Sequence, residues 1–344
     1  MPWCRHCFVN LHWNRHQHAA EVSGIIENVH LPPHIRRLIE DRAGAVGFAP
    51  LKRAAGILSD AYRDGSPAGI RHLPAAERAA AYMVTRMPAT YAAAWRVLGE
   101  VRQRLEGRPV QSILDVGAGT GASALAARHW FPDAAITLLE RDGAFAEAAR
   151  ECLPGASLRM EDAARLTAFP PHDLVIAAYS LNELPMEVAE RLWRAAGEAL
   201  VAIEPGTPAG FSRIREFRDR LLAQGAHMVA PCPAGTPCPL AAPDWCHFGA
   251  RVERSGLHRR VKDAGLNYED EKFSYVALGR QGAPLAVARI LRRPEHHPGL
   301  VILRTCRASG TGMERIGRRD RPGFRAARAA AWGDAWDGAP EGAE

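Results

Sequence analysis

Lysine is scarce in this chain, and arginine supplies almost all of its positive charge. Of the 44 basic residues only Lys52, Lys262 and Lys272 are lysine, and with 38 acidic residues the formal net charge is +6. An arginine-rich surface suits phosphate groups, because the guanidinium fork matches phosphate oxygens. A GC-rich genome, whose codons favour arginine and alanine, produces the same composition. Composition alone leaves both interpretations open.

Two further absences restrict where the protein is expected to act. No apolar run has the length of a membrane span, so we expect no membrane-embedded segment. The first residues lack the apolar stretch of a secretory signal. Seven cysteines without such a signal favour free thiols over a disulfide framework. We therefore expect a cytoplasmic protein, or a protein of the mitochondrial matrix if the host is eukaryotic.

The chain is expected to divide into three parts. Residues 1–105 are expected to form a helical region, because apolar residues recur at three- and four-residue spacing from about residue 21 onward. From 106 to 310 strand-like and helix-like segments alternate, which predicts a doubly wound α/β sheet. In this interpretation 288–293 and 300–306 are strands at the far edge of that sheet. Residues 311–344 are rich in Gly, Arg and Ala, which predicts a flexible tail.

The most informative segment is the decapeptide Ser-Ile-Leu-Asp-Val-Gly-Ala-Gly-Thr-Gly at residues 112–121. A short apolar strand leads into Gly117, Gly119 and Gly121, which allow a tight turn with no Cβ atom to obstruct a ligand. The next residues, 122–130, are good helix formers. A strand, a glycine turn and a helix N-terminus together form a nucleotide-sized site at the carboxyl end of a parallel sheet.

Acidic residues at the ends of three successive strands narrow the choice of nucleotide. Asp115, two residues before the first glycine, suits the amino-acid part of S-adenosylmethionine. Glu140 ends the second strand and suits the ribose hydroxyls, and Glu161 and Asp162 follow the third and suit the adenine amino group. Any one of these acids alone is typical of a helix cap or a surface charge. Their order after the turn favours S-adenosylmethionine over a nicotinamide or flavin, or a fold without ligand.

The residues after the fourth strand, 178–184, carry no distinct catalytic signature. They should lie under the transferred methyl group, where Ser180 and Asn182 are candidates to bind an acceptor amine. The Asn/Asp-Pro-Pro-aromatic run typical of amine methyltransferases is absent, and residues 53–261 contain no lysine to act as base in ribose methylation. A Pro-Cys pair ending at Cys232 follows the fifth strand, whereas carbon-5 pyrimidine methylation places it after the fourth.

Three cysteines crowd a segment at 228–250 that is rich in proline and glycine. They are Cys232, Cys238 and Cys246. Cys306, on the last predicted strand, joins them if that strand packs beside the segment. Four thiolates suit tetrahedral zinc or a [4Fe–4S] cluster, and His247 or His258 would allow a Cys3His zinc site. Unrelated loop cysteines are the remaining interpretation.

The longest motifs of the chain resemble one known family. They are GAHMVAPCP, CPL, DWCHF and RSGLHRRVKDAGLNYEDEKFSYVALGR around the cysteines, and RMPATYAAAWRVL, LDVGAGTG, AAYSLNELP and IEPGTPAGF elsewhere. They are similar to the methyltransferase-like family of the mitochondrial small ribosomal subunit and its bacterial relatives, from about Leu31 to Cys306. Residues 1–30, which are poorly defined, and those after about 310 lie outside the resemblance.

The resemblance implies a class I, Rossmann-like, S-adenosylmethionine-dependent methyltransferase that acts on small-subunit ribosomal RNA in ribosome assembly or translation. It also implies a [4Fe–4S] cluster, by motif position on Cys232, Cys238, Cys246 and Cys306; the resemblance, and not the spacing, selects iron over zinc. A non-catalytic assembly factor that keeps the fold is the alternative, and a redox sensor that controls ribosome binding is a third hypothesis. We expect a monomer away from the ribosome.

Arginine-rich segments on both sides of the cysteines are candidates for an RNA-facing surface. They contain Arg213, Arg215, Arg218 and Arg220, and then Arg251, Arg254, Arg259, Arg260 and Lys262. Two such segments around a cysteine-rich loop favour contact with phosphates. Because few aromatic residues are nearby, we expect shape and phosphate contacts to dominate over base recognition.

Overall fold

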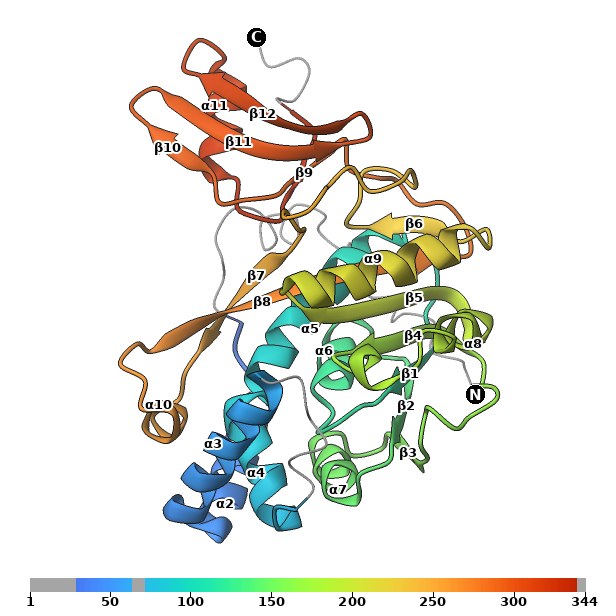
Figure 1. The fold of residues 1–344 in the computed structure, drawn as a ribbon, viewed down its shortest axis with the longest axis vertical. Coiled ribbons are helices and arrows are strands. Elements are labelled where there is room, and N and C mark those ends of the chain that lie inside the picture. The colour runs from blue at the N-terminus through green and yellow to red at the C-terminus, as the bar shows by residue number, and fades with distance from the viewer. Residues whose placement is uncertain (1–28, 64–71, 339–344) are drawn as a thin grey trace, which may run out of the picture.

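The computed structural model describes residues 29–63 and 72–338, which are coloured in Figure 1. The described chain starts with the helices α2 (Pro33–Val46), α3 (Phe48–Arg63), α4 (Ala75–Thr85) and α5 (Met87–Arg104). The predicted N-terminal helices are therefore confirmed, and residues 1–28 lie outside the described part. Proline lies in the first turn of α2 and of α5. It favours a helix start, because backbone N–H groups in the first turn have no partner within the helix and proline therefore loses no hydrogen bond there.

The central element is a mixed eight-stranded sheet. Its order is β3-β2-β1-β4-β5-β8-β6, and β7 also pairs with β8. The strands are β1 (Ser112–Val116), β2 (Ala135–Glu140), β3 (Ser157–Met160), β4 (His172–Ala178), β5 (Ala196–Pro205), β6 (His227–Ala230), β7 (Phe248–Glu253) and β8 (Tyr268–Gly279). Strands β1 to β5 run parallel, and β8 runs antiparallel to β5, β6 and β7. The predicted doubly wound Rossmann-like methyltransferase sheet is confirmed, with antiparallel strands added at one edge.

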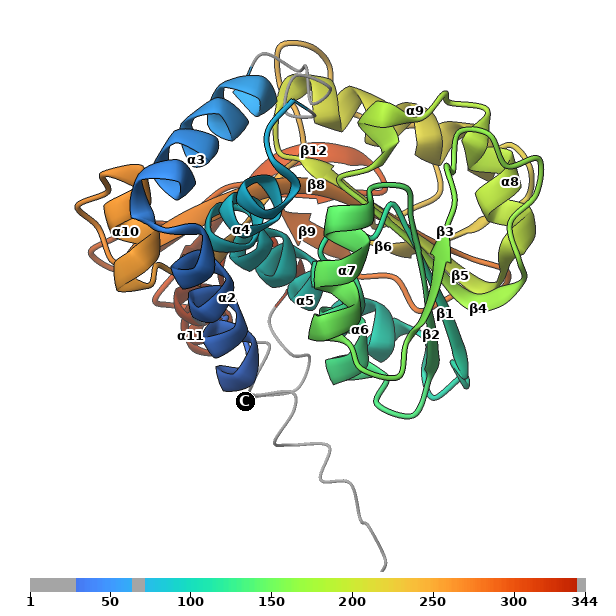
Figure 2. The same cartoon turned by 90° about the horizontal axis from the view of Figure 1, so that it is seen from below.

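Helices cover both faces of this sheet, as Figure 2 shows. On one face lie α5, α6 (Ala122–Trp130) and α7 (Gly143–Cys152), and on the other α8 (Val188–Ala195) and α9 (Pro208–Leu222). The short α10 (Gly256–Lys262) packs on α3 and α4. The strand order reverses between β1 and β4, so a crevice opens at their carboxyl ends, where α/β proteins bind ligands. No helix in the described part of the chain is long and apolar enough to cross a membrane.

A second, smaller sheet follows β8 and corrects two predictions. Strands β9 (Ala288–Ile290), β10 (Glu295–His297), β11 (Leu300–Arg307), β12 (Gly310–Gly317) and β13 (Ala335–Trp336) form it, and α11 (Arg321–Ala329) packs on β11 and β12. The segments 288–293 and 300–306 therefore do not extend the main sheet. The expected tail at 311–344 is wrong as far as 336, because Val301, Leu303, Ala327 and Trp336 share a buried core that its Gly- and Arg-rich composition conceals.

The cysteine segment joins β6 to β7 along the chain and contacts the second sheet. Residues 231–247 form no helix or strand between β6 and β7, and β9 of the second sheet lies nearby through Arg289, which donates to the Pro231 carbonyl at 2.9 Å. Figure 1 shows the second sheet at one end of the molecule, beyond β6 and β8.

Candidate functional site

A cavity of about 390 Å³ lies at the carboxyl ends of β1, β2, β3 and β4. Its polar lining includes Glu140, Arg141, Asp142, Glu161, Asp162 and Glu183, so carboxylates outnumber the one arginine. Tyr82 and Thr90 on α4 and α5 form another part of the wall. A pocket of this size holds a nucleoside-sized ligand, and its acidic lining favours a ligand with positive charge.

The glycine turn forms one wall of the cavity, as the decapeptide predicts. Gly117, Gly119 and Gly121 have φ values of 70°, 55° and 84°, a region that glycine enters without steric cost. Gly117 also needs its missing side chain, because a Cβ there would lie 2.7 Å from the Ser180 Cβ. Gly117 and Gly119 line the cavity, whereas Gly121 precedes α6 and faces Ala149 and Leu153 on α7.

Glu140 lines the cavity and also supports its floor. Its carboxylate accepts hydrogen bonds from the backbone N–H groups of Gly119, Arg141 and Asp142, each at 2.8 Å. Burial raises the pKa of Glu140, although these three donors act in the opposite direction. The carboxylate therefore fixes the glycine turn against the end of β2 and lies beside the space where a ligand would bind.

Asp115 occupies a different position from the one expected. It is fully buried and does not line the cavity; its Oδ2 accepts from Ser123 Oγ at 2.7 Å and from the Ala124 N–H at 3.0 Å. Burial raises the pKa of Asp115 to about 7. Asp115 therefore holds the start of α6 behind the glycine turn, and its proposed contact with a cofactor is not seen in the geometry.

Arg141 bridges the mouth of the cavity between β3 and the residues that follow β4. Its guanidinium lies 3.4 Å from Asp162 Oδ2 and 2.7 Å from Glu183 Oε2. Glu161 and Asp162 both line the cavity, as predicted, and Glu161 pairs with Arg159 at 2.6 Å. The third strand end therefore contributes two carboxylates to the site, and each is held by an arginine that the sequence did not single out.

Ser180 and Asn182 both line the cavity, but Ser180 is committed to the fold. Its hydroxyl donates to the Val116 carbonyl at 2.9 Å and its Cβ closes the space above Gly117. Asn182 belongs to a short 3-10 turn, Leu181–Glu183, where the wall is open to a substrate. The geometry therefore leaves Asn182 as the better placed of the two candidates.

Two residues near this wall were not found from the sequence. Glu204, fully buried at the end of β5, accepts from the Leu181 N–H at 3.0 Å, and burial raises its pKa to about 7. Tyr179 has a φ of 57°, and its hydroxyl donates to Glu271 Oε1 at 3.0 Å. Glu204 repeats the signal that marked Glu140, an acid at a strand end, and could have been found that way. Tyr179 depends on a non-local contact with β8.

The four candidate metal ligands line one smaller cavity of about 50 Å³ between α9, the cysteine segment and β11. They are Cys232, Cys238, Cys246 and Cys306, and none is in a disulfide. Within residues 29–63 and 72–338, however, no three His, Cys, Asp or Glu side chains are arranged to hold a metal ion. The fold thus brings the thiols to one place without assembling a ligand set. His247 and His258 do not line this cavity, so the Cys3His alternative gains no support.

Burial dominates the electrostatics of these thiols. It raises the pKa of Cys232, raises that of Cys306 to about 12, and raises that of Cys246 well above its usual value. Neighbouring thiolates act in the same direction for each of the three, and the cations Arg218 and Arg289 oppose it at Cys232. A metal that displaced the protons of these thiols would leave soft thiolate ligands, and the buried guanidinium groups beside them would offset the negative charge of such a centre.

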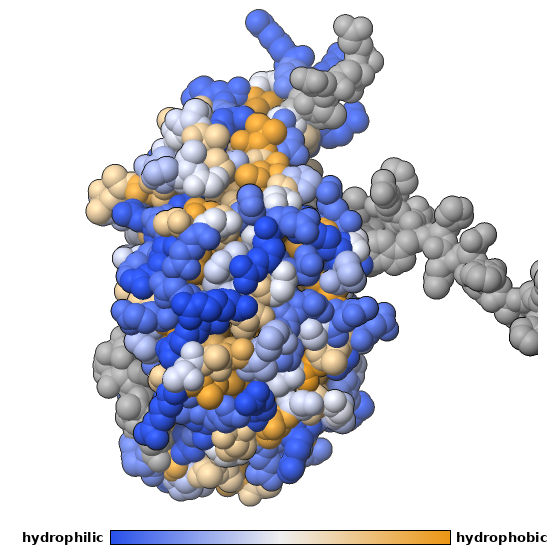
Figure 3. Space-filling view, turned by 90° about the vertical axis from the view of Figure 1, so that its right-hand side faces the viewer, coloured by the Kyte–Doolittle hydropathy of each residue, from blue (hydrophilic) through white to orange (hydrophobic). Residues whose placement is uncertain are grey.

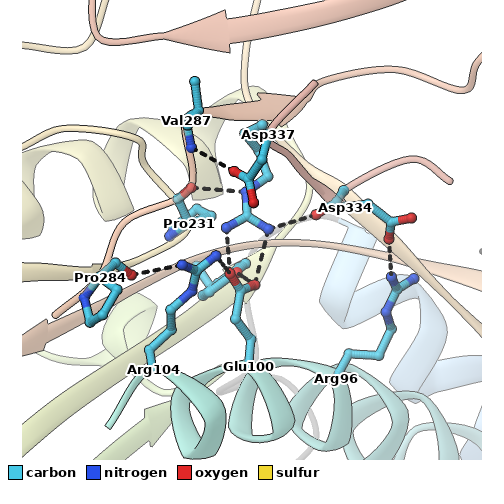
Figure 4. Close-up of polar contacts among 11 residues, drawn as sticks. Arg96, Glu100, Arg104, Pro231, Pro284, Val287, Asp334 and Asp337 are labelled. Carbon is cyan, nitrogen blue, oxygen red and sulfur yellow. Dashed lines mark hydrogen bonds and ion pairs between the residues drawn. The ribbon is translucent and has the colours of Figure 1, made fainter. Parts of the chain in front are cut away.

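Arg289 connects this cavity to the N-terminal helices. It is buried on β9, pairs with Glu100 of α5, and donates to the carbonyls of Pro231 and Gly333 at 2.9 Å each. Figure 4 shows Glu100 directed from α5 toward this junction, with Arg104 beside it. Since Arg289 lies opposite Cys306 in the β9–β11 pairing, one buried cation joins α5, the cysteine segment and the second sheet.

Most cations of the two segments expected to face RNA bind carboxylates or carbonyl groups of the protein itself. Arg218 is buried and donates to the Thr236 carbonyl, and Arg220 pairs with Glu190 at 3.0 Å. On the other side Arg251 pairs with Asp270 and Arg254 with Glu269, each at 2.7 Å. Further pairs link Arg213 to Glu204 and Lys262 to Glu269. The prediction of an RNA surface on these segments is therefore not supported.

The family assignment follows from comparison with known proteins. Residues 76–337, about three quarters of the chain, match the family described as mitochondrial small ribosomal subunit Rsm22. The chain belongs to the Rsm22 family. The matched range contains the cavity at the strand ends, the four cysteines and all strands of the second sheet. The predicted resemblance is thereby confirmed, and it reaches about thirty residues beyond Cys306.

Curated relatives in the Rsm22 family are longer than this chain. The human "Ribosome assembly protein METTL17, mitochondrial" is 30% identical over 288 residues. The match covers 74% of this chain and 61% of that protein. Two Rsm22-cox11 tandem proteins, mitochondrial, of Schizosaccharomyces pombe are 25% identical over 320 residues, 74% of this chain and 42% of each. The chain thus spans less than two thirds of the length of these relatives.

Several of the similar solved structures are methyltransferases. The plantazolicin methyltransferase BpumL, in complex with a monoazolic desmethylPZN analog and SAH, aligns at a TM-score of 0.42 and 12% identity, covering 72% of this chain and all of that one. A precorrin-6y C5,15-methyltransferase from Geobacter metallireducens aligns at 0.35 and 17%, covering 52% and 84%. The fold assignment of this Rsm22-family chain rests on its strand order.

Proposed function

We propose that this protein binds S-adenosylmethionine in the cavity at the ends of β1 to β4 and acts in assembly of the small ribosomal subunit by methylating its RNA. The observation that carries the proposal is the cavity itself, with Glu140 and Asp162 at successive strand ends around a glycine turn. A sulfonium ion is positively charged, which suits this acidic lining. Gly119 and Glu140 would support the ribose, and Asp162 the adenine.

Calorimetric titration of the purified protein with S-adenosylmethionine tests the cofactor. We expect binding by the wild type and at least tenfold weaker binding by Glu140→Gln, which loses a charged acceptor in the cavity wall. Glu147→Gln, an exposed position on α7, is the matched control and should bind like the wild type. Absence of binding by the wild type refutes the cofactor assignment.

Methyl transfer is the finer part of this proposal. S-adenosylmethionine supplies an activated methyl group, and this chain would have to position an acceptor against the wall formed by Asn182. Incubation of the protein with labelled cofactor and small-subunit RNA from a strain lacking the gene should transfer label to the RNA. Asn182→Ala should reduce the transfer at least tenfold while cofactor binding persists.

A second function, a non-catalytic assembly factor, is favoured by a specific observation. The Ser180 hydroxyl is bound to Val116 and the Tyr179 hydroxyl to Glu271, so neither is available to an acceptor. Under this hypothesis, Gly117→Val blocks cofactor binding, yet subunit assembly continues. Loss of assembly together with loss of a methyl mark would refute it.

The cysteine cavity completes the proposal. We assign Cys232, Cys238, Cys246 and Cys306 as ligands of a [4Fe–4S] cluster, with zinc as the alternative; such a centre would tie the cysteine segment to β11. Anaerobically purified protein should contain iron and acid-labile sulfide, and Cys238→Ser should lose both. Zinc without sulfide overturns the cluster. The proposed site of action is the compartment in which the subunit is assembled, the cytoplasm or the mitochondrial matrix, and we propose a monomer away from the ribosome.

A further inference from the structure

The second sheet holds the positive charge of this protein. Residues 286–338 contain eleven arginines and five acidic residues, a surplus of six that equals the formal net charge of the whole chain, +6. The remainder of the chain is therefore balanced. Figure 1 places this sheet and α11 at one end of the molecule.

Four of these arginines are used inside the protein. Arg289 pairs with Glu100, Arg292 with Asp244, Arg293 with Asp270, and Arg307 with Glu314. Five others follow β12 and continue along α11, and we name them the arginine stripe. They are Arg318, Arg319, Arg321, Arg325 and Arg328, all exposed. Among residues 29–63 and 72–338 no carboxylate pairs with any of the five.

The arrangement of the arginine stripe is unfavourable for the isolated protein. Arg321, Arg325 and Arg328 are spaced four and three residues apart on α11, so like charges lie on one face of the helix. Arg321 is also the first residue of α11, where the helix dipole disfavours a cation. The segments at 213–220 and 251–262, by contrast, hold a carboxylate partner for most of their cations. The exception calls for a partner that brings negative charge.

We propose that the arginine stripe binds the phosphate backbone of RNA. This inference rests on the proposed RNA partner and assigns it a surface that differs from the two segments first expected. Guanidinium groups pair with phosphate oxygens in two parallel hydrogen bonds, and a helical rise of about 1.5 Å per residue spreads Arg321 to Arg328 over about 10 Å. The apolar side of α11 supplies Phe324 and Ala327 to the core of the small sheet, so the one large apolar side chain of this helix, Phe324, packs on the protein and is not presented to a membrane.

A triple variant tests the surface. Arg321→Gln, Arg325→Gln and Arg328→Gln together remove three charges and keep a good helix former at each position. The matched control removes three scattered exposed arginines that lack an ion pair with any described residue: Arg37→Gln, Arg150→Gln and Arg259→Gln. Binding to a fluorescent RNA duplex and to small-subunit RNA is measured against salt concentration. Unchanged thermal unfolding of the triple variant confirms that it folds.

We expect the triple variant to bind RNA at least tenfold more weakly at about 0.1 M salt, with a salt slope smaller by about 2 to 3, since each phosphate contact contributes about 0.9. The control should change both values little. Equal loss by both triple variants, or loss by the control alone, overturns the stripe while RNA binding by the protein stands. Wild-type protein that binds neither RNA overturns the proposed partner as well. Binding of the same variants to vesicles containing phosphatidylserine is measured in parallel. If the triple variant loses only vesicle binding, the arginine stripe is assigned to a membrane and the proposal is overturned.

Discussion

The buried pair of Glu100 and Arg289 gives the sharpest test of how this structure is held together. Both carboxylate oxygens of Glu100 accept from the guanidinium, and Tyr275 donates to the same carboxylate at 2.7 Å. Burial acts to raise the pKa of Glu100, but Arg289, Tyr275 and Arg104 together outweigh it and hold that pKa below its usual value. Removing either partner leaves a buried charge without compensation, which costs about 3–5 kcal/mol.

Arg289→Met should therefore lower the free energy of unfolding by about 3–5 kcal/mol, measured by urea denaturation followed by circular dichroism. Glu100→Gln should cost a similar amount. The double variant should lose less than the two single losses added, with a coupling energy of about 1–3 kcal/mol, because it leaves neither charge unpaired. Arg104→Gln is the control; Arg104 lies 3.6 Å from Glu100 at the edge of the pair and should cost less than about 1 kcal/mol.

The pH dependence gives this prediction a second, independent outcome. In the wild type the depressed pKa of Glu100 means that its stabilisation is complete above the unfolded pKa and is lost as pH falls through the folded pKa. In Arg289→Met burial dominates, so the folded pKa of Glu100 rises and its protonation relieves the unpaired charge. The deficit of Arg289→Met relative to wild type should shrink as pH falls from about 7.5 toward about 5. A deficit below about 1 kcal/mol, or one that grows toward acid, refutes the reasoning.

Three further predictions concern the cavity proposed to bind S-adenosylmethionine and the residues beside its wall. Gly117→Ala places a Cβ 2.7 Å from the Ser180 Cβ at a φ of 70°, so it should lower the free energy of unfolding by about 2–3 kcal/mol and abolish cofactor binding. The control Gly107→Ala has a similar φ of 82° but open space around it, so it should cost only about 1 kcal/mol and leave binding measured by calorimetry unchanged. Arg141→Ala removes the bridge across the cavity mouth, so stopped-flow release of S-adenosylhomocysteine should accelerate several-fold while stability changes by less than about 1 kcal/mol. Burial raises the folded pKa of Glu204 to about 7, so the folded state holds this proton more tightly than the unfolded state does. As pH rises from about 4.5 to about 7, the wild type should therefore lose about 2–3 kcal/mol of stability, and Glu204→Gln should abolish this pH dependence.

Local sequence signals predicted the parts of this structure that depend on neighbours in the chain. The alternation from residue 112 onward was sufficient for the parallel sheet, and glycines at positive φ were sufficient for the turn of the cavity. Acids at strand ends located Glu140 and Asp162, but not their partners. Whether an acid faces the cavity, like Glu140, or the back of the turn, like Asp115, depends on how α6 packs, which no local pattern records.

The predictions that the structure corrects or does not support concern charge and composition. Residues 213–220 and 251–262 look like exposed basic segments until β8 and α8 supply Glu269, Asp270 and Glu190 from elsewhere in the chain. Residues 311–336 look like a tail until strands far apart in sequence bury Trp336 and Ala327 together. In both cases the missing information is the non-local partner. It decides whether an arginine forms an ion pair within the protein and whether an apolar side chain is buried.

The helix α5 links the two cavities and gives them a common physical support. Thr90 near its start lines the cavity at the strand ends, and Glu100 near its end pairs with Arg289 beside the cysteines. Arg289 in turn lies opposite Cys306 on β11, the strand that supports the arginine stripe through α11. The two cavities therefore share α5 as a common support, and the junction at Arg289 also joins α5 to the second sheet, which carries the surface proposed to bind RNA.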